Sequence, residues 1–331
     1  MKKSKIILLI YLTCIMFSAC SSKDSSSKDS SINQTPSTPA KEDVSDLQQN
    51  DSKVYRFSWG YDVFRPGEEM GIYQEEGQLV RSTVYKGGEL PLGVSIFINK
   101  DDSEPINFGL LVLVDGLPVE FTPEGERQAT YMHPFQVIKD TICKFTLTPT
   151  FQSEAGRIDI IIAADLMNIQ GDTAVLPLYV DNQSGEYNNK NSNNPVHVLS
   201  IPSDFQASPQ SGDAHIPCWI YQADTDESMH TGQSATNRIN LSSDGNEWLY
   251  ESTTGLPGEL RTIFFLDYKP YIVLNDKPYV DWSPSYGEML SLPITFSDIE
   301  DSSIFMPVTI RMDDTDMKHQ TLILRRFLIN P

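Results

Sequence analysis

Apolar residues recur at every second position along most of this chain, and that period constrains the fold more than any other feature. In "YRFSWGY" (55–61) the aromatic residues hold alternate positions, and "VSIFIN" (94–99) and "VTIRMDD" (308–314) repeat the pattern. A period of two is typical of β-strands that bury one face. The sequence therefore predicts strands along most of the chain.

Three further runs are apolar at successive positions: "GLLVLV" (109–114), "RIDIII" (157–162) and "TIFFL" (262–266). Such runs are typical of central strands that are covered on both faces. Two other strands contain proline, "AVLPLYV" (174–180) and "LSLPITF" (290–296). Because proline cannot donate to a strand ladder, we expect these two at sheet edges.

Turn residues interrupt the chain often, as in "RPGEE", "KGGE", "VDGLP" and "SSDGNE", and no helical stripe follows the first twenty residues. Many short strands separated by Gly, Pro, Asn and Asp favour antiparallel sandwiches. About 280 residues from Val54 onward suit two domains. We predict an all-β protein with two tandem antiparallel β-sandwich (immunoglobulin-like) domains after a disordered tether.

The two halves of the folded part show matching motifs. "LVLVDGLPV" (111–119) resembles "IFFLDYKPY" (263–271), and "LTPTF" (147–151) resembles "LPITF" (292–296) in the same order. In each half Asp and Pro are placed as in a hairpin turn. Duplication is therefore the favoured interpretation, with chance recurrence of short β motifs as its alternative.

The N-terminus has a basic cluster, a short apolar stretch from Ile6 to Phe17, small residues and then Cys20. This order is typical of a secretory signal peptide, and the apolar stretch is shorter than the roughly 20 residues that span a bilayer. "FSAC" resembles the lipobox of bacterial lipoproteins, although Phe17 stands where leucine is usual. The resemblance implies that Cys20 carries a lipid; an ordinary signal peptide is the alternative.

A lipid with two acyl chains at Cys20 would hold the protein stably on a bilayer. The residues from Ser21 to Ser52 contain no aromatic side chain and are rich in Ser, Asp and Lys. Such a segment buries too little apolar surface to fold, and as a flexible coil it would reach on the order of 30 Å. We expect lipid attachment at the outer face of the bacterial cell membrane, with the outer membrane as the alternative.

These features give one expected domain order: signal peptide 1–19, lipidated cysteine and tether 20–52, first sandwich 53–182, Asn-rich linker 183–195 and second sandwich 196–331. Loss of the signal peptide removes three lysines and no acids, which changes the net charge from −20 to −23. A chain this acidic lacks the basic patch that nucleic acid requires, so we expect no nucleic-acid partner.

Motifs for catalysis or cofactors are missing from the sequence: there is no G-x-S-x-G elbow, Cys–His signature or glycine-rich phosphate loop. His215 and Cys218 are spaced three apart, but a structural zinc site needs two such pairs. Cys143 and Cys218 alternate with apolar residues, which favours two buried thiols over a bridge between the halves. We therefore predict no enzyme activity, no metal site and no cofactor.

Two kinds of ligand site stay open. Acidic loops at 222–228, 242–247 and 312–316 offer oxygen ligands for calcium but do not match an EF-hand, so solvated loops are the favoured interpretation. Four aromatic residues are candidate sugar-stacking side chains, although tryptophan more often fills a core: Trp59, Trp219, Trp248 and Trp282.

The function that the sequence favours is that of a membrane-anchored, non-enzymatic envelope lipoprotein. Its sandwiches would bind a protein partner through strand edges or loops, or act as a surface spacer. A carbohydrate-binding surface module is the alternative, and a hydrolase is the third choice, because no pair of carboxylates stands out. The expected partners are the lipid bilayer through Cys20 and an envelope protein or glycan.

Overall fold

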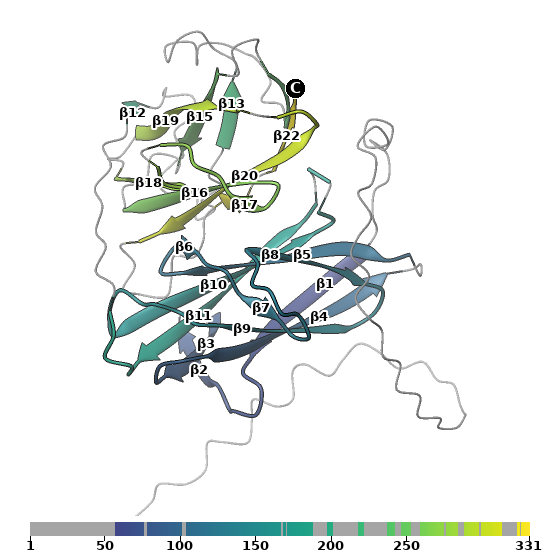
Figure 1. The fold of residues 1–331 in the computed structure, drawn as a ribbon, viewed down its shortest axis with the longest axis vertical. Coiled ribbons are helices and arrows are strands. Elements are labelled where there is room, and N and C mark those ends of the chain that lie inside the picture. Colours follow the sequence, from purple (N-terminus) through teal and green to yellow (C-terminus); the bar gives the residue numbers. More distant parts are fainter. Residues whose placement is uncertain are drawn as a thin grey trace, which may run out of the picture. The chain divides into compact units, whose positions relative to one another are not determined.

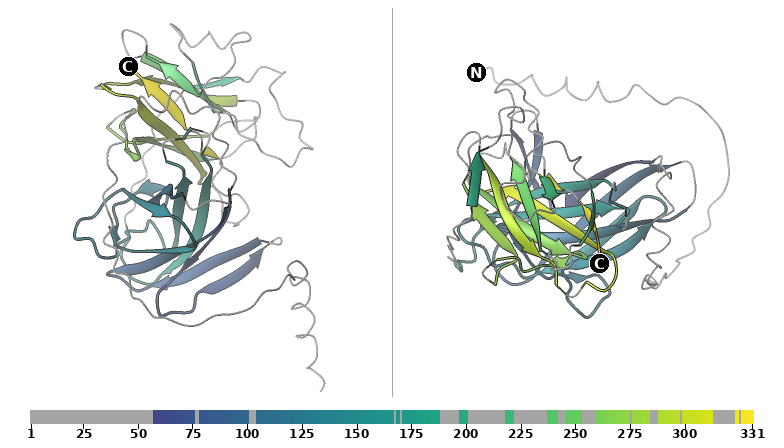
Figure 2. Two further views of the ribbon diagram at one scale, coloured as in Figure 1. Left: turned by 90° about the vertical axis from the view of Figure 1, so that its right-hand side faces the viewer. Right: turned by 90° about the horizontal axis from the view of Figure 1, so that it is seen from above.

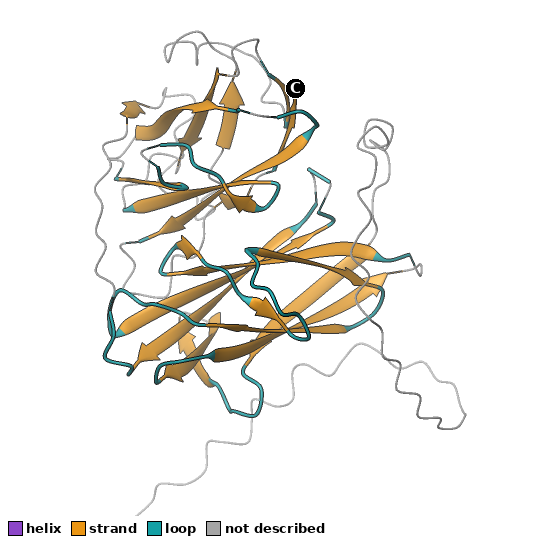
Figure 3. Cartoon of the chain, in the orientation of Figure 1, coloured by secondary structure: helices purple, strands orange, loops and turns teal. Residues whose placement is uncertain are grey.

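The structure is a computed structural model that describes residues 57–75, 78–100, 104–166, 168–169, 171–187, 197–200, 218–221, 237–241, 246–252, 259–274, 276–283, 288–297, 299–312, 323–324 and 326–331. Its regular structure in these ranges is β-strand throughout, without a helix (Figure 3). No helix of the described part is long and apolar enough to cross a membrane. The expected signal peptide, Cys20 and the tether lie outside the described residues.

Two sheets form the first sandwich (Figure 1). The smaller sheet has the order β1 (Phe57–Phe64), β4 (Leu90–Lys100), β9 (Thr141–Leu147) and β7 (Thr122–Pro123). The larger sheet has the order β2 (Gly71–Glu75), β3 (Gln78–Tyr85), β11 (Thr173–Asn182), β10 (Ala155–Ala164), β5 (Ile106–Val114) and β6 (Leu117–Pro118), and β8 (Met132–Val137) pairs with β5.

The second sandwich also has two sheets, which Figure 2 shows from two further sides. The smaller sheet has the order β12 (His197–Ser200), β19 (Glu288–Thr295), β15 (Asn246–Ser252) and β13 (Cys218–Tyr221). The larger has the order β14 (Arg238–Asn240), β22 (Phe327–Asn330), β20 (Ser303–Arg311), β16 (Leu260–Leu266) and β17 (Lys269–Pro270); β18 (Tyr279–Trp282) pairs with β16 and β21 (Ile323–Leu324) with β20.

Alternation along the strands builds a separate core in each sandwich. In β4, Val94 and Ile96 are fully buried, whereas Phe97 between Ile96 and Ile98 is 51% exposed. Cys143, Phe145 and Leu147 of β9 enter the same core, as their spacing predicts. The core of the second sandwich includes Phe264, Phe305 and Phe327. The prediction of an all-β chain with tandem sandwiches is confirmed.

The sequence predicts antiparallel sandwiches, but two of the strand pairs are parallel. β3 runs parallel to β11, and β14 runs parallel to β22. All other strand pairs among the described residues are antiparallel. The parallel pair falls at the equivalent place in both larger sheets. In each sandwich this pair places the last strand, β11 or β22, beside a strand from the early part of the same sandwich, β3 or β14.

The match between the halves extends to single residues. Asp115 follows β5 with a φ of 47°, and Asp267 follows β16 with a φ of 46°. The Asp115 carboxylate accepts from the backbone N–H of Arg157 at 2.8 Å, and that of Asp267 accepts from Ile304 at 2.9 Å. Each aspartate thus ties its turn to the neighbouring strand. With the shared strand order, this equivalence supports the duplication that the motifs suggest.

The two proline-containing strands are not edge strands, so that prediction is wrong. β11 lies between β3 and β10, and β19 lies between β12 and β15. The physical rule still holds locally. The pairing of β3 with β11 begins at Leu178, one residue after Pro177, and the pairing of β12 with β19 ends at Ser291, before Pro293. Each proline therefore sits where its strand has a neighbour on one side only.

Candidate functional site

An apolar cluster joins the two sandwiches. Leu111 and Leu113 of β5 and Ile161 of β10 point away from their own core and meet residues of β16 and β20. The residues from the second half are Ile263, Phe265, Tyr268, Tyr279, Ile304, Met306, Val308, Ile310 and Leu328. Full burial of such a side chain contributes about 1.5–3 kcal/mol. The strands that are apolar on both faces are thus explained: one face fills a core and the other fills this cluster.

Arg326, next to β22, connects the second sandwich to the first through hydrogen bonds at one end of this cluster. Its side chain is 1% exposed, and its two Nη atoms share their four N–H groups among five acceptors, at 2.8–3.0 Å, in the loop between β10 and β11 and the strand residues that flank it. The acceptors are the carbonyl oxygens of Ala164, Asp165, Asn168 and Asp172 and the hydroxyl of Thr173. Because these acceptors have fixed directions, the guanidinium sets one position of this loop against β22.

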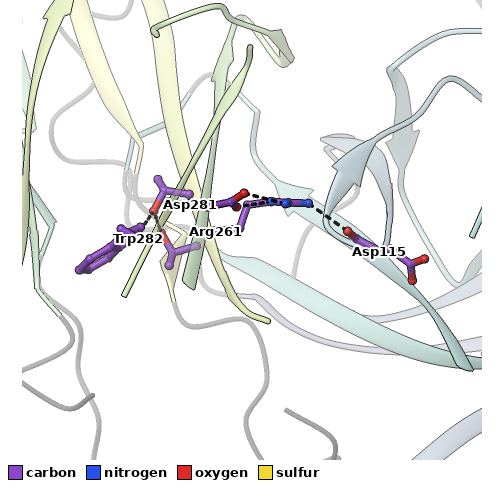
Figure 4. Close-up of polar contacts among 6 residues, drawn as sticks. Asp115, Arg261, Asp281 and Trp282 are labelled. Atoms are coloured by element: carbon purple, nitrogen blue, oxygen red, sulfur yellow. Dashed lines mark hydrogen bonds and ion pairs between the residues drawn. The ribbon is translucent and has the colours of Figure 1, made fainter. Parts of the chain in front are cut away.

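Two further polar contacts cross between the sandwiches. Arg261 of β16 is held by the Asp281 carboxylate, with Nε···Oδ1 of 2.6 Å, and its Nη1 donates to the carbonyl of Asp115 at 3.3 Å (Figure 4). The Tyr268 hydroxyl donates to the carbonyl of Leu166, and burial raises the pKa of this phenol to about 12. Both contacts are made to backbone oxygens of the first sandwich. Like the Arg326 contacts, they therefore help to hold the second sandwich against the first.

A hollow on the outer face of the smaller sheet of the first sandwich is the candidate ligand site. It has a volume of about 250 Å³ and is lined by Ser58, Trp59 and Gly60 of β1, by Phe97, Ile98 and Asn99 of β4, and by Asp140. Gly60 pairs directly with Phe97 in the register of these strands. A Cβ at Gly60 would meet no heavy atom within 4 Å, so the space above this glycine is open.

A second glycine–phenylalanine pair on the same face shows what is unusual about the first. Phe64 pairs with Gly93, and a Cβ at Gly93 would stand 2.3 Å from the Phe64 ring. There the ring fills the space over the glycine, which is the ordinary way a strand shields a bare backbone. The Phe97 ring does not do this at Gly60, and it is 51% exposed. The hollow therefore consists of the exposed Phe97 ring beside the backbone of Gly60, which no side chain covers.

Polar groups line the rim of this hollow. Ser58 and Asn99 pair across the strands and are both exposed. The Asp140 carboxylate accepts from the backbone N–H of Ile98 through Oδ1 at 3.0 Å, which fixes its place at the rim. Trp59 is half-buried; its ring meets Phe108 edge-on at 5.4 Å and its Nε1 donates to Asp172 at 2.8 Å. Donors and acceptors thus surround one aromatic surface.

The tryptophans predicted as sugar-stacking residues do not converge on one site. Trp282 is 3% exposed and its Nε1 donates to the Thr262 hydroxyl at 3.0 Å, so it is a core residue and its prediction as a surface aromatic is wrong. Trp59 is one of the residues that line the hollow. Trp219 and Trp248 lie on β13 and β15, where the backbone alone is described. The lipid-attachment residue Cys20 lies outside the described residues.

The register of β13 and β15 nevertheless groups aromatic residues. Trp219 pairs with Tyr250 and Tyr221 pairs with Trp248. Directly paired residues and residues two apart share a face of a sheet, so these four positions belong to the same face. Trp248 also pairs with the exposed Pro293, whereas the buried Leu292 pairs with Leu249. This face is therefore opposite to the core face in strand register.

The remaining predicted groups have varied positions. Cys143 is free and 7% exposed, and burial raises its thiol pKa to about 12. The side chains of Cys218 and His215, and the acidic loops at 222–228 and 313–316, lie outside the described residues. Among the residues with described positions, no group of three or more His, Cys, Asp or Glu is arranged to hold a metal ion.

A charged side chain protects one end of the edge strand β1 from pairing with an added strand. The backbone N–H of Val63 donates to the Asp62 carboxylate at 2.9 Å, and Arg81 holds that carboxylate through two contacts of 2.5 and 3.0 Å. A strand that added to this edge would have to displace Asp62. Charged side chains at an edge are a common defence against such pairing. Partner binding by strand addition at this end of β1 is therefore disfavoured.

Comparison with known proteins finds only distant structural likenesses. No family model matches the sequence, and no curated protein matches it. A protein of unknown function from Porphyromonas gingivalis is 9% identical with a TM-score of 0.21, over 81% of this chain and 97% of that chain. The FN1–FN3 domains of chicken CNTN1 are 8% identical with a TM-score of 0.20, over 77% of this chain and 69% of that chain.

Proposed function

We propose that this protein is a membrane-anchored, non-enzymatic envelope lipoprotein whose two sandwiches act as one stiff unit. Cys20 attaches it to the outer face of the bacterial membrane, and the segment up to Ser52 serves as the tether. The stiff unit binds an envelope protein or holds a binding surface at a distance from the bilayer. The signal-peptide pattern and the lipobox-like "FSAC" support the location.

One observation carries this proposal: the interface between the sandwiches is apolar and is fastened by Arg326. Interfaces between domains of one chain are usually more polar than those of permanent complexes, and domain motion is the ordinary expectation unless the interface is large and hydrophobic. Here the central strands of both larger sheets contribute buried residues. A stiff pair of sandwiches on a tether suits a protein that presents a surface rather than one that closes around a substrate.

Carbohydrate binding is the second candidate function. The register that assigns Trp219, Tyr221, Trp248 and Tyr250 to one face of β13 and β15 favours it, because aromatic residues on a sheet face suit the flat faces of sugar rings. Trp248→Ala tests this function. A loss of binding to cell-wall glycan would support it and place the site on β13 and β15. Unchanged binding would exclude this aromatic row as the site, and the absence of glycan binding by the wild-type chain would contradict the function.

Crosslinking capture on intact cells tests the main proposal. The tagged chain is compared with a Cys20→Ala variant, which cannot be lipidated. We expect one specific envelope protein with the wild-type chain and none with the variant, in which the chain itself should also leave the membrane fraction. Membrane association that survives Cys20→Ala would contradict the anchor, and glycan captured without protein would favour the second candidate.

A further inference from the structure

We propose that the hollow over Gly60 binds one neutral pyranose ring of an envelope glycan, with the ring stacked on Phe97. This inference rests on the second candidate function and names a site for it on the first sandwich. The site is separate from the aromatic row of β13 and β15.

The aromatic surface is the first reason. A pyranose has a face of C–H groups that packs on a phenyl ring, whereas its edges carry hydroxyls. Phe97 is 51% exposed on a sheet face whose neighbouring position, Gly60, is open. At the equivalent pair on this face, Phe64 covers Gly93. Of these two pairs, the pair of Gly60 and Phe97 leaves both a ring and the space beside it available to a ligand.

The rim is the second reason. Ser58, Asn99 and Asp140 supply a hydroxyl, an amide and a carboxylate around the ring. Binding sites for small molecules combine an apolar surface with a few polar groups that fix orientation. The Asp140 carboxylate is itself positioned by the N–H of Ile98. These groups match the hydroxyls at the edge of a sugar.

Size and charge narrow the ligand class. The volume of about 250 Å³ is below the range of roughly 300–1,000 Å³ for pockets that enclose drug-sized ligands. One ring, as part of a longer chain that continues into solvent, fits this space. Asp140 at the rim and the net charge of −20 disfavour phosphorylated or uronic sugars. A neutral sugar such as N-acetylglucosamine is the expected class.

The test uses saturation-transfer NMR and calorimetry on the purified full chain with Cys20→Ala. N-acetylglucosamine and cellobiose are the neutral probes, and glucuronic acid is the anionic probe. A small, open site predicts a Kd on the order of 1 mM for the neutral probes. Saturation should reach the C–H protons of the ring first, because these face Phe97. Glucuronic acid should bind several-fold more weakly.

Gly60→Val is the decisive variant. A Cβ at Gly60 would meet no heavy atom within 4 Å, and valine suits a strand, so we expect the melting temperature to be kept while the hollow is filled. We expect Gly60→Val and Phe97→Ala to weaken binding at least about tenfold. Ile142→Ser is the matched control: Ile142 is 61% exposed on the same sheet, does not line the hollow, and its change should leave binding intact.

Two results would overturn the inference. One is the absence of binding by both neutral probes at concentrations tenfold above the expected Kd. The other is binding that Gly60→Val leaves unchanged. If Trp248→Ala abolishes binding in that second case, the carbohydrate function stands and its site lies on β13 and β15. If neither variant matters, the sugar binds elsewhere on the chain, and both the hollow and the row on β13 and β15 fail as its site.

Discussion

Gly171 lies so close to Arg326 that a Cβ added to the glycine would stand 2.5 Å from Nη1 of the arginine. The same Cβ would also stand 2.5 Å from the carbonyl oxygen of Ala164 and 2.8 Å from that of Asp165. Both oxygens are acceptors for the guanidinium. The loop between β10 and β11 therefore closes around Arg326 with no room for a side chain at this position.

Gly171→Ala should destabilise the protein by about 1–3 kcal/mol, because overpacking of a closed site costs this much. The measurement is urea unfolding followed by fluorescence. Gly60→Ala is the matched control, since the same change is made where a Cβ meets nothing within 4 Å. The control should leave stability unchanged or raise it by up to about 1 kcal/mol. Equal losses in the two variants would contradict the tight fit at Gly171.

Arg326→Met should cost about 3 kcal/mol or more, because four carbonyl oxygens and a hydroxyl lose a charged donor. Arg326→Lys should lose less, since an ammonium group keeps the charge and three donors but cannot serve every acceptor. Chemical denaturation of the three proteins gives the ranking. A methionine variant as stable as the wild type would show that the apolar cluster alone holds the sandwiches together.

The buried carboxyl of Asp159 should make the stability of the fold depend on pH. Its side chain is fully buried beside Arg157, and burial raises the pKa of the carboxyl, although the arginine opposes this shift. The folded state therefore holds the proton more tightly than the unfolded chain. This contribution to stability is present below the unfolded pKa, near 3.9, and is lost as pH rises through the folded pKa.

The comparison with Asp159→Asn isolates this effect, because asparagine does not titrate. The stability of the wild type relative to the variant should fall as pH rises from about 4 toward neutrality. Urea unfolding at several pH values in this range measures the difference. A difference that stays constant, or that grows with pH, would show that Arg157 holds the carboxyl in its charged form.

Cys143 should react slowly with thiol reagents. Burial raises its pKa to about 12, so almost no thiolate is present at neutral pH. In a chain whose other cysteines are replaced by serine, modification should follow global unfolding and accelerate in denaturant. Fast labelling under native conditions would contradict the position of Cys143 in the first core.

Much of the fold could be predicted from local pattern. Alternation in "VSIFIN" placed Val94 and Ile96 in a core, and it also left Phe97 on the solvent side, which was the available signal for the hollow. The run "GLLVLV" predicted burial on both faces, but no local pattern could identify the second half as the cover. The local pattern shows which faces of a strand are buried, but it does not show which part of the chain covers them.

The role of Arg326 could not be predicted. Four of its five acceptors are backbone carbonyls, which lie 154 to 162 residues earlier in the chain, and a carbonyl has no residue type to recognise. Trp282 was misassigned for a related reason: the Thr262 hydroxyl that satisfies its indole N–H lies on a neighbouring strand. Both features depend on long-range pairing, which appears only once the sheets are assembled.

Scanning calorimetry of the full chain with Cys20→Ala tests most directly whether the two sandwiches form one unit. The shared apolar cluster predicts a single transition in which the calorimetric and van't Hoff enthalpies agree. Arg326→Met should lower the melting temperature of that whole transition. Two separate transitions in the wild type, with only one shifted by Arg326→Met, would show that the sandwiches unfold independently and would contradict a stiff unit.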